Sequence, residues 1–312
     1  MFERRHILPA MVREQKPRGA FVDRVTQTWV RATGTAVSLA EHPWLEGPVG
    51  DVDVIGVGFF ERLAQRRGWT VVESGTRGLL ESFSCLSGPS CNAAAVHPQV
   101  ACFYERTSEY DFDVWSEWSG TFKPFGSALA AIFSQRLQQL NVPLSALDTK
   151  LGMVSRVMQL VDADGQRAGT AWVREAVATG RTVYAGSYSH CRPPGFAGTC
   201  IRVAFPLPNG YALVVMKPEV HADGSFTARS EGKRFGDPGF YFFVQGATPG
   251  LGWARYLPYL KESIHVYVDA RGAPRADHDL QLWGSRFLRL HYRMRQITAA
   301  PRPNDGALTA PA

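Results

Sequence analysis

The sequence has no long hydrophobic run. None of its stretches approaches the roughly 18 consecutive apolar residues that a transmembrane helix needs. Near the N-terminus, the apolar patch Ile7–Val12 has charges on both sides and is shorter than the roughly 7–15-residue apolar core of a secretory signal. These two absences predict a chain without an integral membrane segment and with a cytoplasmic location.

Cysteine is scarce, and the spacings of metal-binding motifs are missing. The chain has five cysteines, an odd number that indicates reduced thiols in a cytoplasmic protein. Cys191 and Cys200 are spaced to face each other across a hairpin, and the spacing leaves open whether they are bonded. No CxxC or HExxH pattern occurs, so we expect no metal site, and nothing specific indicates haem or another cofactor.

Basic residues exceed acidic ones, but the motifs of nucleic-acid-binding proteins are missing. The formal net charge is +6, from 34 Lys and Arg against 28 Asp and Glu. The densest basic segment, residues 4–31, is interrupted by acidic residues and is not accompanied by a zinc finger, an RNP-type aromatic motif or a glycine-rich RNA loop. A solvated basic arm explains this charge, and we expect no nucleic-acid partner.

Composition and the positions of proline and glycine divide the chain into four parts. With 45% hydrophobic and 12% aromatic residues, the sequence is typical of a folded globular protein. We predict an N-terminal arm over residues 1–50, with a helix near 20–31, and a mainly helical region over 51–145. An antiparallel β domain over residues 150–296 and a disordered Ala/Pro-rich tail over 297–312 follow.

One segment imitates the start of a dinucleotide-binding unit. Residues Asp51–Ser74 are consistent with a strand, a Gly56-x-Gly58 turn, a helix and a second strand. Glu61 occupies the position of the third glycine and would repel the phosphates, and no further alternating units follow. We therefore predict an ordinary helix whose apolar residues pack inward, namely Phe59, Phe60, Leu63 and Ala64.

After Gly152, turn signals separate short runs of β-forming residues. Asn-Gly and Asp-Gly supply the positive φ that tight hairpins require. The four predicted turns lie at Asp162–Gly165, Pro208–Gly210, Ala222–Gly224 and Asp269–Gly272. These sites predict a series of β-hairpins.

The runs between the turns alternate between apolar and polar residues. In residues 287–294, Leu288, Leu290 and Tyr292 share one face, opposite Arg289 and His291. Period 2 over several hairpins indicates an antiparallel sheet with two unlike faces. About eight or nine strands in roughly 145 residues favour a closed or nearly closed barrel, or a strongly curved sheet. The predicted fold class is α+β, a helical N-terminal part followed by this antiparallel β-barrel-like or strongly curved sheet domain.

The polar face of these strands, together with one aromatic segment, holds the candidate site. If the sheet closes, His, Tyr and Arg side chains on an interior face are costly unless they are paired or used. The candidate ligand-binding residues are Trp115, Tyr188, His190, Arg202, His265, Tyr267, Arg289 and His291. The alternative is an ordinary antiparallel sheet whose polar face meets solvent.

The segment Phe103–Pro143 joins the two halves of the chain and is predicted to cover the β domain. It combines a dense aromatic and acidic stretch with an amphipathic helix from near Ser127 to Leu140. We expect a small, largely apolar molecule to bind in the cavity of the barrel-like domain under this cover. The alternatives are an isomerase, cyclase or hydrolase that uses His, Tyr and carboxylate groups in the same cavity, and a structural or interaction protein without a cavity.

Overall fold

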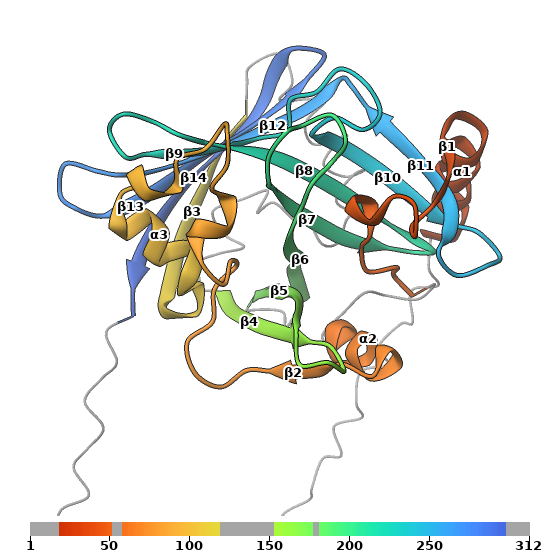
Figure 1. Cartoon of the computed structure of the whole chain (residues 1–312), viewed down its shortest axis with the longest axis horizontal. Helices are drawn as coiled ribbons and strands as arrows, with labels where there is room; N and C mark the ends of the chain where they lie inside the picture. The colour runs from red at the N-terminus through yellow and green to blue at the C-terminus, as the bar shows by residue number, and fades with distance from the viewer. Residues whose placement is uncertain (1–18, 52–57, 119–152, 177–180, 298–312) are drawn as a thin grey trace, which may run out of the picture.

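The described residues form fourteen strands and three α-helices. The computed structural model describes residues 19–51, 58–118, 153–176 and 181–297 (Figure 1). The helices are α1 (Gly19–Thr33), α2 (Phe59–Arg67) and α3 (Pro98–Glu105). The strands are β1 (Thr35–Ser38), β2 (Thr70–Val72), β3 (Tyr110–Trp118), β4 (Met153–Val161), β5 (Arg167–Ala176), β6 (Arg181–Cys191), β7 (Cys200–Leu207), β8 (Gly210–Val220), β9 (Phe226–Arg229), β10 (Gly239–Gln245), β11 (Leu251–Leu257), β12 (Leu260–Val268), β13 (Pro274–Leu282) and β14 (Ser285–Gln296). The protein is therefore mostly β-sheet, with its helices in the N-terminal part.

The strands join into one antiparallel sheet that forks at β8. The main path runs β2-β4-β5-β6-β7-β8-β9-β12-β13-β14-β3. The first part of β8, residues Gly210–Val215, also pairs with β10, which continues to β11 and β1. Its last part, Lys217–Val220, pairs with β9. The predicted antiparallel sheet from Gly152 to Met294 is confirmed, and β1, β2 and β3 extend it.

All four predicted turns connect neighbouring strands of the sheet. They join β4 to β5, β7 to β8, β8 to β9 and β12 to β13. Gly165, Gly224 and Gly272 have φ values of 76°, 79° and 75°, and Asn209 has a φ of 59°. The glycine and asparagine signals therefore marked positions where the backbone turns through the left-handed region.

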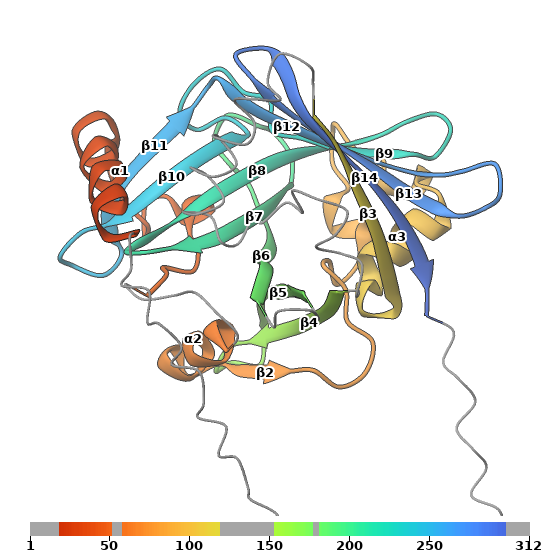
Figure 2. The same cartoon turned by 180° about the vertical axis from the view of Figure 1, so that it is seen from behind.

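The sheet is not closed into a barrel, which corrects the barrel-like part of the fold prediction. The two ends of the main path, β2 and β3, each pair on one side alone within the described residues. The sheet nevertheless bends strongly, as Figures 1 and 2 show. Phe112 of β3 reaches Trp172 of β5, with 5.1 Å between ring centroids, although these strands are not hydrogen-bonded neighbours. Side chains therefore close one part of the bend where backbone pairing does not.

Described segments cover one half of the outer face of the bend. Under β4, β5 and β6, α2 packs Phe59, Phe60 and Leu63 into a separate apolar cluster. Residues 37–49 cover the outer face of β7, β8 and β10 in the same way. Because both faces of these central strands are covered, β7 and β8 consist of nearly continuous apolar residues. None of the three described α-helices lies over the outer face of β12, β13 and β14, and there apolar and polar residues alternate along the strands.

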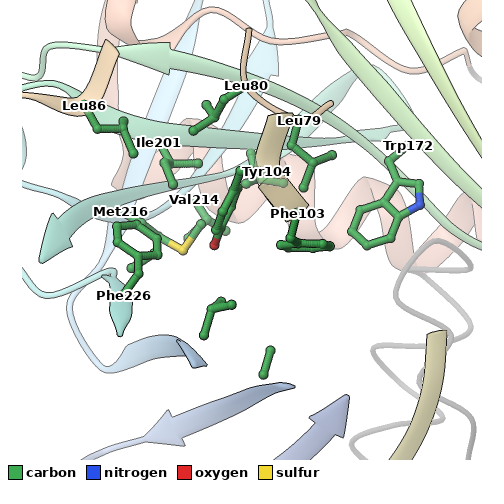
Figure 3. Packing of buried hydrophobic residues seen from close by; sticks show 14 of the residues in the cluster. Leu79, Leu80, Leu86, Phe103, Tyr104, Trp172, Ile201, Val214, Met216 and Phe226 are labelled. Carbon is green, nitrogen blue, oxygen red and sulfur yellow. The ribbon is translucent and has the colours of Figure 1, made fainter. Parts of the chain in front are cut away.

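The inner face of the bend holds the largest apolar core. Residues 79–104, which include α3, supply one side of this core, and the strands supply the other. Figure 3 shows Leu79, Phe103 and Tyr104 lying against side chains from the strands, among them Met216 and Phe226. Residues 79–104 therefore pack on the concave side of the sheet and share one apolar core with its strands.

The strand that follows α2 joins the antiparallel sheet, while residues 52–57, with Gly56 and the strand predicted before it, lie outside the described residues. The strand β2, which follows α2, pairs with β4 in antiparallel orientation. Glu61 forms an ion pair with Arg156 of β4 at 2.8 Å between Nη2 and Oε1. The four apolar residues predicted to face inward from this helix are buried.

The N-terminal parts of the chain also differ from the predicted division. The helix predicted near 20–31 is α1, which packs on β10 and β11, and β1 of the predicted arm pairs with β11. Two strands, β2 and β3, lie in the stretch predicted to be mainly helical. The helix predicted near 127–140 and the tail from residue 298 lie outside the described residues. Within the described residues, the acidic aromatic segment Tyr110–Trp118 is strand β3, which pairs with β14.

Candidate functional site

The eight predicted site residues lie on two different faces of the sheet. Five of them, on β12, β14 and β3, share the part of the outer face that no described helix covers: Trp115, His265, Tyr267, Arg289 and His291. Alternation projects these five residues from one side of neighbouring strands. That side is the one opposite the concave core.

Three of these five residues form one cross-strand row together with Asp277. His265 pairs with Asp277, Asp277 pairs with His291, and His291 pairs with Trp115 in the strand register. The His291 Nδ1 lies 2.7 Å from Asp277 Oδ1, and the His291 ring stacks on Trp115 with 5.6 Å between centroids. This outer row, defined as His265, Asp277, His291 and Trp115, is an internally paired polar surface.

The first histidine of the outer row continues into a second hydrogen-bonded chain. His265 Nδ1 lies 3.0 Å from Thr227 Oγ1, which lies 2.7 Å from His221 Nε2. The Tyr267 ring stacks on the His265 ring, with 5.2 Å between their centroids. Partial burial, followed by the positive potential of His221, lowers the pKa of His265. His265 is therefore more neutral at a given pH than a free histidine.

A shallow hollow of about 590 Å³ lies beside this chain and is open to solvent. Its lining includes His221, Asp223, Arg229, His265 and Asp279. His265 is the one member of the predicted set that lines it. Asp279 is already bound by Arg289, whose Nε and Nη2 donate to its two carboxylate oxygens at 2.6 Å each. Asp279 therefore has a protein partner, whereas the Nε of Arg229 beside the hollow has no hydrogen-bond partner.

The Arg289–Asp279 pair should give a modest, acid-sensitive contribution to stability. Arg289 lowers the pKa of Asp279 through its hydrogen bonds, so the pair stabilises the fold above the unfolded carboxyl pKa of about 3.9. We expect Arg289→Met to lower the free energy of unfolding at pH 7 by about 0.5–1 kcal/mol. The difference from the parent should shrink as the pH falls through the lowered pKa of Asp279. Urea denaturation at pH 7 and at decreasing pH values measures both effects, and a difference that grows in acid would contradict the assignment.

The remaining three predicted residues do not join the outer row. Arg202 projects to the covered part of the outer face, where it donates to Ser189 Oγ at 2.8 Å and to the carbonyl of Pro43 at 2.9 Å. His190 ends β6 and is exposed. Tyr188 alone points to the concave core. The structure therefore does not bring all eight residues to one concave site.

Tyr188 belongs to a different polar cluster on the inner face. Four side chains from β5, β6 and β14 make up this arginine–tyrosine cluster: Arg174, Tyr184, Tyr188 and Tyr292. Arg174 opposes Tyr184 in the strand register, and the hydroxyl groups of Tyr184 and Tyr188 lie 2.5 Å apart. Three of its members, on β6 and β14, thus bring hydroxyl groups to one buried cation.

Arg174 is deeply buried and incompletely paired. It is 7% exposed, and its Nε has no hydrogen-bond partner. Its Cζ lies 5.3 Å from the centroid of the Phe112 ring and 5.7 Å from that of Trp172. Burial lowers the pKa of this guanidinium, although arginine keeps its charge in proteins. Among the described residues, no carboxylate forms an ion pair with Arg174.

The three tyrosines of the cluster remain hydrogen-bonding phenols at neutral pH. Burial raises the pKa of Tyr184, of Tyr188 and of Tyr292. Each of these side chains nevertheless keeps some accessible surface. The three phenols are therefore largely desolvated groups that remain partly accessible.

A carboxylate–imidazole pair borders the same inner face. Glu262 of β12 and His278 of β13 lie 3.2 Å apart, between Oε2 and Nε2, with their side chains 11% and 16% exposed. Burial is the main cause of the raised pKa values of Tyr184, Tyr188 and Tyr292, and the negative charge of Glu262 adds to it. The inner face therefore combines a cation, phenols and an acid–base pair in a largely apolar surround.

The two faces differ in how deeply their charged groups are buried. On the outer face, most charged groups form ion pairs in the solvated arrangement typical of antiparallel sheets, and Arg229, whose Nε also lacks a hydrogen-bond partner, has a side chain that is 36% exposed. On the inner face, a buried guanidinium keeps a free donor, which is costly in the absence of a partner. The inner face is for this reason the better candidate for a functional site.

Sequence analysis missed Arg174, Glu262 and His278. Each of them breaks the alternation: Arg174 shares a face with Trp172, Glu262 with Ile264, and His278 with Ala276. A charged or titratable residue at the position of an apolar one is a signal that the sequence does contain. Listing residues on the polar face could not find them, because they lie on the other face.

The chain has a distant relative of undescribed function. It is 27% identical over 222 residues to the protein described as uncharacterized membrane protein YndJ of Bacillus subtilis (strain 168). The aligned region covers 70% of this chain and 38% of YndJ, so the chain spans well under half the length of that relative. No family model matches the sequence, and no solved structure matches it.

The helices of the described residues do not include a membrane-spanning one. None of them is both long enough and apolar enough to cross a bilayer.

Proposed function

We propose that the protein binds a small, largely apolar molecule against the inner face of its curved sheet. The arginine–tyrosine cluster is the observation that supports this proposal most directly. Its cation is buried with a free donor, while its three tyrosines are desolvated and keep accessible surface. Ligand sites typically combine apolar and aromatic walls with a small number of placed polar groups.

Aromatic side chains supply the apolar walls of the proposed site. The Trp172 ring lies 5.1 Å from Phe112, 5.5 Å from Tyr184 and 5.9 Å from Tyr188, between ring centroids. Tyr184 also meets Phe205 at 5.6 Å. These rings come from β3, β5, β6 and β7, so the bend of the sheet, and not one local motif, would form the site.

Binding of a neutral aromatic probe tests this proposal. We expect 1-aminoanthracene to bind the parent protein saturably, with an increase in its fluorescence. Trp172→Leu should weaken this binding about 3- to 10-fold, since an aromatic contact contributes about 0.5–1.5 kcal/mol beyond its buried area. Native mass spectrometry of freshly purified protein should, in addition, detect a bound small molecule.

Trp283→Leu is the matched control for this experiment. Trp283 is 73% exposed at the turn between β13 and β14, away from the inner face. Its replacement should leave probe binding unchanged. If the parent does not bind the probe saturably, the site is solid and a structural or interaction role replaces the proposal. If Trp172→Leu and Trp283→Leu bind alike, the location is wrong.

An enzyme on the same scaffold is the second candidate function. The observation that favours it is the Glu262–His278 pair, at 3.2 Å beside protonated tyrosine hydroxyls. A carboxylate that orients an imidazole, with a proton donor nearby, is suited to general acid–base chemistry. Chemical conversion of the co-purifying molecule by the parent, and not by His278→Gln, would support this function.

A further inference from the structure

We propose that the ligand carries a single carboxylate group and that Arg174 binds this group through its guanidinium, whose Nε has no hydrogen-bond partner. This inference rests on the proposed function, since it assigns a chemical class to the molecule bound at the inner face.

The charge of Arg174 lacks a protein counterion among the described residues. A guanidinium that is 7% exposed has lost most of its hydration, and a buried charge is usually paired. Two carboxylates that act electrostatically on the cluster have other partners: Glu262 pairs with His278, and Asp111 with Arg295. An anion supplied by a ligand would complete the missing pair.

The rings beside Arg174 leave its donors available. Phe112 and Trp172 lie under the central carbon of the guanidinium and so interact with its charge. The N–H bonds lie in the plane of the group, where the rings accept no directed hydrogen bond. The unpartnered Nε is one of these donors. A planar carboxylate matches the planar fork of donors that an arginine presents.

The hydroxyl groups of the cluster favour the same ligand. Protonated phenols can donate to an anion, and the raised pKa values keep Tyr184, Tyr188 and Tyr292 protonated at neutral pH. A carboxylate has two oxygens with about four acceptor positions, enough for the guanidinium and for tyrosine hydroxyls. The cluster is therefore rich in donors at the place where a ligand oxygen would sit.

The number of charges argues for a carboxylate rather than a phosphate monoester. One cation offsets one negative charge, and a second negative charge would be buried without compensation. Glu262 borders the tyrosines and would repel a dianion further. The ligand class is therefore a monocarboxylic acid with an apolar, aromatic-compatible body.

A matched pair of probes tests this assignment directly. Naphthalene-2-carboxylate and naphthalene-2-carboxamide have nearly the same shape and differ in charge. By isothermal titration calorimetry at pH 7, we expect the parent to bind the carboxylate about 10- to 100-fold more tightly, the range expected for hydrogen bonds to a charged group. Arg174→Met should abolish this preference and leave carboxamide binding within about threefold of the parent.

The control is Arg255→Met. Arg255 also lies over an aromatic ring, that of Trp29, and also has an unpartnered Nε, but it belongs to β11 on the other branch of the sheet. Its replacement should leave the preference for the carboxylate intact. Arg174→Lys keeps the charge without the planar fork, so it should keep part of the preference and serves as a second variant if Arg174→Met folds poorly.

The thermal midpoint of the ligand-free protein separates a binding role from a structural one. Removing an uncompensated buried charge should leave the midpoint of Arg174→Met unchanged or raise it, because polar groups at binding sites commonly reduce stability. A lower midpoint together with an unchanged preference would assign Arg174 to packing alone and overturn the proposal.

The probes also distinguish failure of this inference from failure of the proposed function. If 1-aminoanthracene binds and the parent binds both naphthalene compounds equally, the site exists and its ligand is not an anion. If none of the three compounds binds, the proposed function fails and the carboxylate assignment fails with it.

Discussion

Replacing Phe226 with alanine is expected to lower the free energy of unfolding by about 3–5 kcal/mol, the usual cost of truncating a large buried aromatic residue. Phe226 is fully buried at the start of β9, and its ring lies 5.0 Å from Phe83 and 5.4 Å from Tyr104, between centroids. These contacts join the segment that fills the concave side to the sheet itself. The truncation therefore removes apolar burial and also leaves a cavity between the two layers.

Urea denaturation followed by tryptophan fluorescence measures this effect. Leu251→Ala is the control, because Leu251 is 47% exposed at the start of β11 and its truncation should cost less than about 1 kcal/mol. A loss below about 1 kcal/mol for Phe226→Ala as well would mean that residues 79–104 do not pack against β9 in solution. Loss of the transition altogether would mean that this contact is needed for folding.

Many of the hairpins in the sheet could be predicted from the sequence, because the residues at each turn determine its backbone conformation. Positive φ at Gly165, Gly224 and Gly272 follows from Asp-Gly and related pairs, so those turns could be located without a structure. The alternation in β12 and β14 likewise separates a polar from an apolar face in any antiparallel sheet. These features depend on residues close together in the chain.

The bend, the fork and the missing closure could not be predicted in the same way. They depend on contacts between distant segments, such as Phe112 with Trp172 and β8 with both β10 and β9. The count of strands and turns is the same for a closed barrel and for a forked, open sheet. The strand and turn pattern therefore fits a barrel as well as an open sheet, and only the observed strand pairing separates the two.

The candidate site could be predicted from the sequence only in small part. His, Tyr and Arg residues at the polar positions of the strands lie mostly in or near the outer row, where solvation and ion pairs explain the same residues. The inner cluster consists of polar groups at apolar positions, and of the eight predicted residues it includes Tyr188 alone. Searching the apolar face for exceptions would have found Arg174 and Glu262 from the sequence.

A valine at position 186 is expected to weaken ligand binding at the inner face by about 10- to 100-fold, equivalent to roughly 1.4–2.8 kcal/mol. Gly186 lies between Tyr184 and Tyr188 on the same face of β6, and its φ is not in the left-handed region. A Cβ there would lie 2.7 Å from the Tyr184 hydroxyl oxygen and 3.2 Å from Phe205. The tyrosine ring must therefore move, and the hydroxyl contact with Tyr188 is lost.

Ala185→Val is the matched control for Gly186→Val. Ala185 is buried on the same strand but faces the apolar cluster under α2, so a valine there overpacks the protein without touching the arginine–tyrosine cluster. Both variants should lose about 1–3 kcal/mol of stability from overpacking. Titration with 1-aminoanthracene and naphthalene-2-carboxylate should then show a large loss of affinity in Gly186→Val and parent-like affinity in Ala185→Val. Equal affinity in both variants would place the ligand elsewhere, because no molecule bound at this cluster could avoid the displaced tyrosine.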